Sequence, residues 1–185
     1  MKRIVVLVAG LLVASTSAFA QAPADADALD RALAPAPRNQ KEAATVIKWK
    51  ADQTYDTLRK GTNKLVCYER TGDPGITAPF AAQCTSLANL ERVAQNRKFA
   101  AITDKAARDK ALADAEANGT RVKPEFGSVW LTMSGPDKAT ARIHTTVAVP
   151  GATAQSMGIH DTNQKGGIWI MNAGTSTAHL MIPGS

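Results

Sequence analysis

Three histidines offer the most direct route to chemistry in this chain, and all lie in its C-terminal part: His144, His160 and His179. Imidazole is the commonest metal-binding side chain, so a site built from all three is a candidate for zinc or copper. None of them has another histidine two or four positions away, the close spacing by which one element supplies two ligands. The same pattern fits histidines on polar faces or in loops. The three residues are therefore candidate metal ligands only if the fold brings them together.

Nucleophilic catalysis is the second possibility. His160 is followed by Asp161, and serines are present at Ser134, Ser156 and Ser176. The Gly-x-Ser-x-Gly sequence of a nucleophile elbow is absent, and a triad is defined by geometry rather than by sequence position. The sequence thus identifies no catalytic residue and no cofactor-binding motif. Whether the protein is an enzyme stays open.

Aromatic side chains offer a binding chemistry. Trp49, Trp130 and Trp169 all lie in segments expected to form strands, where stacking could hold a sugar or a peptide. Tryptophans on strands also commonly fill the core. Carboxylates are few after Arg121, and they form no evident acid/base pair for glycoside hydrolysis.

The two cysteines, Cys67 and Cys84, predict one disulfide bond. A zinc site would need closely spaced ligand pairs, and a redox site would need Cys-x-x-Cys, neither of which occurs. Closing a loop of this size contributes about 3 kcal/mol to stability in the chain-entropy account.

The N-terminus has the pattern of an export signal. Lys2 and Arg3 precede the apolar run Ile4–Ala14, and Ala18-Phe19-Ala20 forms a small-x-small cleavage site. The run is shorter than the ~20 residues of a membrane-spanning helix. We therefore expect residues 1–20 to be a signal peptide that is removed, leaving no integral membrane segment and a periplasmic or secreted protein.

The net charge and the length of the chain limit which partners and how many domains are expected. The signal holds two of the 22 basic residues and none of the 16 acidic ones, so the mature chain carries 20 − 16 = +4. These basic residues are interleaved with acids, which argues against a nucleic-acid partner. Anionic cell-envelope polymers remain candidate partners. The 165 residues left after cleavage suit a single domain.

The pattern along the chain predicts an α+β fold, an antiparallel sheet of about six short strands with an inserted helical segment. Residues 21–43 are an Ala/Pro-rich entry segment with a short helix, and residues 44–185 form one α+β domain. A loop is expected at 79–84, and helix, in two pieces, at 87–117. The segment 44–60 also fits helical spacing, but its β-branched residues favour strands. The expected strands are 45–50, 64–68, 127–134, 141–149, 168–171 and 178–182, and 54–58 is a further strand candidate.

One local string carries a resemblance. Leu58-Arg59-Lys60-Gly61-Thr62-Asn63, followed by Cys67, is similar to a Leu-Arg-x-Gly-Thr-Asn…Cys segment in a family of uncharacterised exported bacterial proteins. Trp169-Ile170-Met171 and the segment 178–183 also resemble the end of that group. The resemblance implies no activity, but it favours the strand interpretation before Gly61.

These observations favour a non-enzymatic exported protein that binds a ligand or an envelope component. A metal-dependent or hydrolytic enzyme using the C-terminal histidines is the alternative. The two hypotheses differ in whether replacement of the histidines removes an activity.

Overall fold

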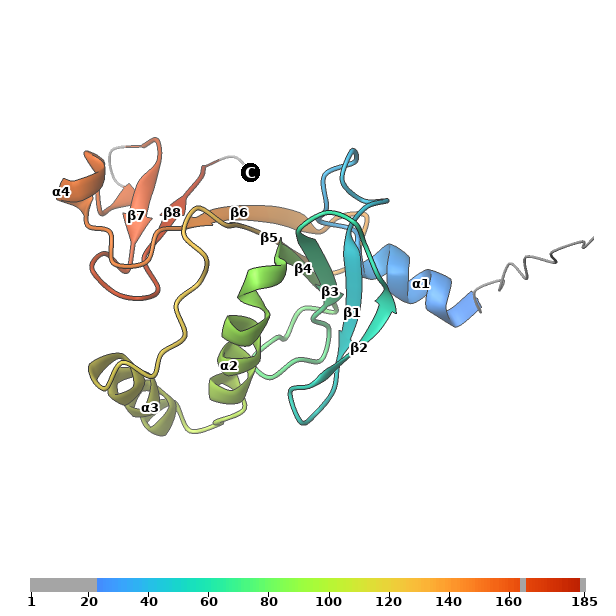
Figure 1. Ribbon diagram of the computed structural model, residues 1–185, viewed down its shortest axis with the longest axis horizontal. Coiled ribbons are helices and arrows are strands. Elements are labelled where there is room, and N and C mark those ends of the chain that lie inside the picture. Colours follow the sequence, from blue (N-terminus) through green and yellow to red (C-terminus); the bar gives the residue numbers. More distant parts are fainter. Residues whose placement is uncertain (1–22, 164–165, 184–185) are drawn as a thin grey trace, which may run out of the picture.

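The computed structural model describes residues 23–163 and 166–183, so the predicted signal peptide lies outside the described residues. These residues form an α+β fold around one sheet of eight strands, in the order β2-β1-β3-β4-β5-β6-β8-β7 (Figure 1). The strands are β1 Thr45–Trp49, β2 Tyr55–Arg59, β3 Leu65–Glu69, β4 Phe80–Ser86, β5 Val129–Gly135, β6 Arg142–Ala148, β7 Trp169–Met171 and β8 His179–Met181. The helices are α1 Pro23–Ala32, the short 3-10 helix η1 Leu87–Asn89, α2 Leu90–Ala100, α3 Lys105–Ala117 and α4 Ala154–Met157.

The fold class is confirmed, but the expectation of about six strands is wrong. The segment expected to be a loop, 79–84, contributes most of β4, which pairs with both β3 and β5. Residues 80–85 of this strand are all buried. A strand buried on both faces shows no alternation of polar and apolar residues, so its sequence lacks the signal of a half-exposed strand.

The start of the sheet also differs from the expected meander. Strand β2 folds back to the outer side of β1, and β1 then pairs in parallel with β3, with Thr45 opposite Val66. The remaining neighbours are antiparallel. The sheet is therefore mostly antiparallel, with one parallel pair next to its β2 edge.

Each face of the first four strands is covered by a helix. On one face, Leu29 and Leu33 from α1 and the residues after it pack against Val46 and the two cysteines. On the other face, Val93 of α2 packs with Ile47, Val66 and Tyr68. This division follows from strand geometry, because successive side chains point to opposite faces. A smaller cluster around Val149, Ile170 and Ala178 stabilises the end of the chain.

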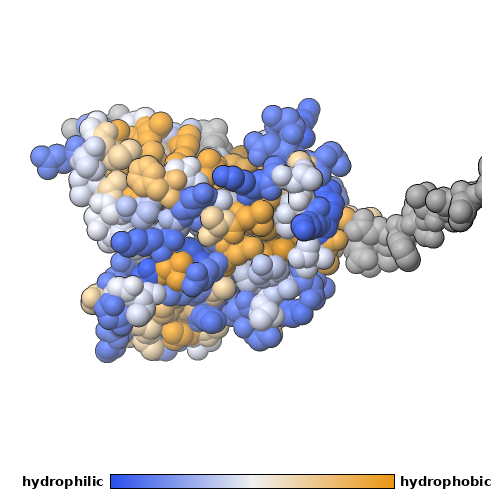
Figure 2. Space-filling view, in the orientation of Figure 1, coloured by the Kyte–Doolittle hydropathy of each residue, from blue (hydrophilic) through white to orange (hydrophobic). Residues whose placement is uncertain are grey.

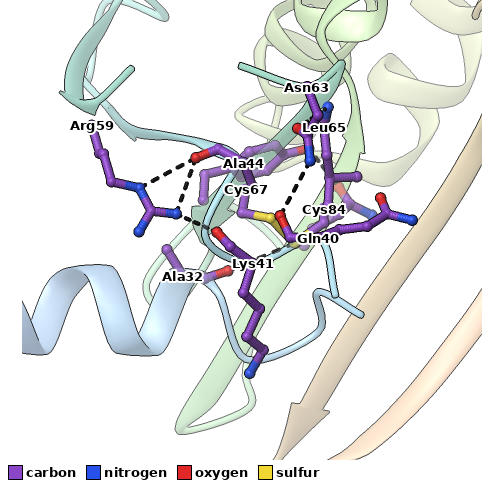
Figure 3. Close-up of a disulfide and its surroundings, with 11 residues drawn as sticks. Ala32, Gln40, Lys41, Ala44, Arg59, Asn63, Leu65, Cys67 and Cys84 are labelled. Atoms are coloured by element: carbon purple, nitrogen blue, oxygen red, sulfur yellow. Dashed lines mark hydrogen bonds between the residues drawn. A yellow bond between two sulfur atoms is a disulfide. The ribbon is translucent and has the colours of Figure 1, made fainter. Parts of the chain in front are cut away.

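The predicted disulfide is confirmed. Cys67 and Cys84 occupy directly opposite positions on β3 and β4, with their Cα atoms 4.1 Å apart, and both are fully buried (Figure 3). Paired positions without mutual hydrogen bonds bring side chains close enough for such a bond. The disulfide thus fastens two central strands beneath α1.

The string that carries the family resemblance has a structural role beside this disulfide (Figure 3). A Cβ atom on Gly61 would lie only 2.2 Å from the Ala43 carbonyl oxygen, so no larger residue fits without movement. The amides of Thr62 and Asn63 donate to that same oxygen at 2.8 and 3.0 Å. Arg59 Nη2 donates to the Ala44 carbonyl at 3.1 Å. These contacts hold the loop before β1 against the segment before β3.

The helical region expected at 87–117 is confirmed, including its division into two main pieces. On α3 the ion pairs Lys105–Asp109 and Lys110–Asp114 form at i,i+4 spacing, with all four side chains largely exposed. Ala115 is its buried residue. Helix α3 therefore lies at the surface, and the chain returns from it to β5 through residues 118–128, which pass close to α2.

Candidate functional site

A pocket of about 300 Å³ lies among α2, the 118–128 linker and the C-terminal strands. Its size is at the lower end of the range for small-molecule sites. In the space-filling view, hydrophilic residues gather between the surface of β7, β8 and α4 and the surface of α2 and α3 (Figure 2). The pocket is lined by Arg92, Asn96, Arg121, Pro124, Trp130, Thr146, Ala148, Asn172, Thr177, Ala178 and His179.

Two polar side chains, the buried Asn89 and the partly exposed Gln95, hold the linker in place beside α2. The amide of Asn89 donates to Ser128 Oγ at 2.9 Å, and its carbonyl oxygen accepts from the Glu125 amide at 2.7 Å. Gln95 Oε1 accepts from the Val122 amide at 3.0 Å. These bonds fix both ends of the linker segment that carries Arg121, so the position of this arginine relative to α2 is set by backbone contacts.

Arg92, on α2, is the most buried charged residue at the pocket, with 4% of its surface exposed. Its Nη1 donates to the Val122 carbonyl and lies 3.3 Å from Ser176 Oγ. Among the described residues, Nε and Nη2 have no hydrogen-bond partner, although a guanidinium carries five N–H donors. Donors of Arg92 thus remain for a bound molecule.

Arg121 comes from the linker and is 8% exposed. Its Nη1 donates to Gln95 Oε1 and its Nη2 to Asn96 Oδ1, both at 2.6 Å. Its guanidinium lies over the Phe99 ring, 5.0 Å from the centroid. Its buried Nε has no hydrogen-bond partner in the described part of the chain. The partners of Arg121 are thus neutral amides and an aromatic ring.

The two buried arginines of the pocket have no carboxylate directly paired with them among the described residues. Within the described ranges, no carboxylate lies within 4 Å of Arg92 or Arg121. The nearby Glu116 instead accepts a hydrogen bond from Ser176 Oγ. Burial, followed by the positive charge of Arg121, lowers the pKa of Arg92 to about 10. Burial also lowers the pKa of Arg121. Two buried cations therefore share the pocket without a directly paired carboxylate among the described residues, although the charge of Glu116 opposes part of both pKa shifts.

His179, one of the three predicted metal ligands, lies at this pocket. Its Nδ1 is 2.7 Å from the Thr177 carbonyl, which can only accept, so Nδ1 carries a hydrogen. The other ring nitrogen, Nε2, is therefore the one available for a further contact. Ser176, considered above as a nucleophile, is buried and bonded to Glu116.

The other predicted site residues lie elsewhere. His144 is exposed on β6, opposite Thr132 of β5. His160 is exposed and forms an isolated bridge with Trp169 at the edge strand β7. In the part of the chain that the structure describes, no three His, Cys, Asp or Glu side chains are grouped so that they could hold a metal ion. The three histidines are not brought together as a ligand set.

A second arginine site lies on the same helix and is built differently. Arg97 forms an ion pair with Asp73, and both side chains are nearly buried, at 11% and 12% exposure. Arg97 Nε also donates to Gln53 Oε1 at 2.7 Å, and the guanidinium lies over the Trp49 ring. Trp49 in turn makes edge contacts with Tyr55 and Tyr68. Here the chain supplies both the anion and the aromatic ring, so the charge of Arg97 is matched internally.

The sequence analysis did not identify Arg92 and Arg121 as site residues. A signal was present, because Asn89, Arg92, Val93 and Asn96 recur at the spacing of one helix face. Polar residues along a stripe that also carries buried apolar residues indicate a polar site beneath the helix. The contribution of Arg121 has no comparable signal, because its position depends on how the linker packs.

Comparison of the chain with protein-family models, with curated proteins and with solved structures found no match in any of the three. Among the described residues, no helix has the length and apolar character needed to cross a membrane.

Proposed function

We propose that this protein is an exported, non-enzymatic binding protein whose pocket between α2 and the C-terminal strands holds a small oxyanion. The proposal rests on one observation: Arg92 and Arg121 are buried at a pocket, and no described carboxylate lies within 4 Å of either. The proposed compartment is the periplasm or the exterior. The N-terminal sequence pattern supports it, and the buried disulfide is compatible with it.

The physical argument concerns the cost of buried charge. Removing an ionised group from water costs several kcal/mol unless it is paired and hydrogen-bonded. At this pocket the cost is raised further because the charges of Arg92 and Arg121 repel one another. A bound carboxylate or phosphate would supply a directly paired negative charge, which the nearby Glu116 does not, and would accept hydrogen bonds from the unused N–H groups. Charge-assisted hydrogen bonds of this type are the strongest that side chains make.

Titration calorimetry of the mature protein at low ionic strength tests this proposal, with sodium acetate and inorganic phosphate as probes. We expect saturable binding of at least one of them. The Arg92→Gln variant should weaken that binding about 10-fold or more, because a lost hydrogen bond to a charged group is worth ~1.5–3 kcal/mol.

The matched control is Arg142→Gln, which removes the same unit of charge from an exposed position on β6. It should leave the affinity nearly unchanged. Equal weakening by both variants would mean that the probes respond to net charge rather than to the pocket. Absence of binding by both probes, or binding that is insensitive to Arg92→Gln, would contradict the proposal.

A further inference from the structure

We infer that His179 is a third anion-binding residue of this pocket, and that its protonation strengthens binding of the anion as the pH falls from about 8 to about 5. This inference rests on the proposed anion-binding function and adds to it a ligand-contacting residue and a form of regulation. Three observations support it: the face of the sheet on which His179 lies, the hydrogen bond that orients its ring, and the charged groups around it.

The register of the C-terminal strands places His179 on the pocket face of the sheet. His179 of β8 lies directly opposite Ala148 of β6. Opposite residues of an antiparallel pair point to the same face. Ala148 and Thr146, its neighbour on that face, both line the pocket, and so does His179 itself. The imidazole is partly exposed, so a molecule in the pocket can reach it.

One hydrogen bond determines which nitrogen of the imidazole is available. Nδ1 of His179 is 2.7 Å from the Thr177 carbonyl oxygen, so the hydrogen of the neutral ring is on Nδ1. Nε2, at the far end of the neutral ring, then carries a lone pair, which repels an oxyanion. After protonation, Nε2 carries a hydrogen and donates to the same oxyanion. Protonation thus changes Nε2 from an acceptor to a donor without a movement of the ring.

The charged groups around His179 come from three other segments of the chain. Arg92 of α2 and Arg121 of the linker line the same pocket. Glu116 of α3 is bonded to Ser176 and acts on both arginines through its charge. The positions of β6 and β7 that pair with β8 carry no titratable side chain. Among the described residues that line the pocket, His179 is the one whose side-chain type changes charge between about pH 5 and 8.

Proton uptake and anion binding therefore favour each other. An anion held by the two arginines places negative charge beside the imidazole, and this charge favours the protonated ring. By linkage, the protonated ring favours the anion to the same extent. A hydrogen bond to a charged group, gained at Nε2, corresponds to about 10-fold or more in affinity. The site should bind its anion more tightly in mildly acidic solution and release it as the pH rises.

Titration calorimetry of the mature protein at about pH 5.5 and about pH 8 tests the inference, with sulfate and formate as probes. Both anions keep their charge over this range, so a change in affinity comes from the protein. We expect at least one of them to bind about 10-fold more tightly at the lower pH, with uptake of a proton from solvent. His179→Gln should bind that probe with the same affinity at both pH values. His144→Gln, which removes the same type of side chain from an exposed position on β6, is the matched control and should retain the pH dependence.

The outcomes separate this inference from the proposal beneath it. If a probe binds in an Arg92-dependent way but equally at both pH values, or if His179→Gln keeps the pH dependence, the inference is overturned and the anion site stands. Equal loss of the pH dependence in His144→Gln would mean a response to net charge, which also overturns it. If neither sulfate nor formate binds at either pH, the anion site fails as well.

A measurement on the unmodified protein covers the case in which His179→Gln does not fold. The Hε1 resonance of His179, followed by NMR at about pH 7, should move toward its protonated position when the probe is added. The Hε1 resonances of His144 and His160, which are exposed elsewhere, should stay in place. A His179 resonance that does not move while the probe binds would contradict the inference.

Discussion

Helix α2 carries two arginine sites that differ in how the buried positive charge is stabilised. Near its C-terminal end, Arg97 lies over Trp49 and is paired with Asp73. Near its start, Arg92 lies beside Arg121; its hydrogen-bond partners among the described residues are neutral, and Glu116 acts on it only through its charge, without direct pairing. Buried cations need an anion close by. The first site receives it from the chain itself, whereas the second leaves room for one from outside.

The contrast extends to the two parts of the sheet. Around β1 to β4, backbone oxygens, cysteines and charged groups meet partners from the same chain, as at Gly61 and at the disulfide. Around β5 to β8, the strands border the pocket and the small terminal cluster. Substitutions in the first part should therefore change stability, and substitutions in the second should change binding.

The largest effect is expected from Asp73→Asn. This change leaves Arg97 buried without its anion, so we expect the free energy of unfolding to fall by about 3–5 kcal/mol. Urea denaturation followed by circular dichroism measures it. Asp114→Asn, which breaks an exposed pair on α3, is the control and should have no measurable effect. A result for Asp73→Asn as small as the control would mean that Arg97 is not held by its ion pair.

Removal of the disulfide should have the next largest effect. The double change Cys67→Ala and Cys84→Ala frees a loop with a sequence separation of 17, and we expect a loss of about 3 kcal/mol in the free energy of unfolding. Affinity for the best probe anion should remain within about twofold at temperatures where the variant is folded, because the pocket is lined by other elements. A large loss of affinity would show that the two parts of the sheet do not act independently.

Gly61→Ala is expected to have a somewhat smaller effect. The added methyl group would overlap the backbone of residues 43–45, and relief of such overpacking costs about 1–3 kcal/mol. Thermal unfolding followed by circular dichroism provides the measurement. Lys60→Ala, at the exposed neighbouring position, is the control and should be close to neutral. An unchanged melting temperature for Gly61→Ala would show that the loop before β1 can move away at little cost.

Some features of the fold could be predicted from the sequence because they have a local signal, and others could not. Strand β1 was predictable because Ile47 and Trp49 alternate with the exposed Lys48. The disulfide was predictable from two cysteines and an export signal. Strand β4 was not, because a strand buried on both faces lacks alternation, and the parallel pairing of β1 with β3 depends on where β2 folds.

The candidate site was harder to predict for a related reason. Charged residues on a helix are usually on its solvated face, and the segment 87–117 is rich in them. That Arg92 is buried is decided by the packing of the 118–128 linker, which also brings Arg121 to it. His179 lies at the pocket, whereas His144 and His160 lie elsewhere, because the register of β6, β7 and β8 sets their positions. Non-local packing of this kind has no counterpart in local sequence patterns.

The smallest change in stability is expected for Arg92→Gln, which is also the variant expected to weaken anion binding most. In the ligand-free protein, Arg92→Gln removes a hydrogen bond to the Val122 carbonyl, but it also removes a buried charge that is repelled by Arg121. These terms oppose one another, so we expect the free energy of unfolding to change by less than about 1 kcal/mol. The same urea denaturation used for Asp73→Asn measures it. Destabilisation as large as that of Asp73→Asn would mean that Arg92 is a structural group held by its own chain, and the difference between the two arginine sites would disappear.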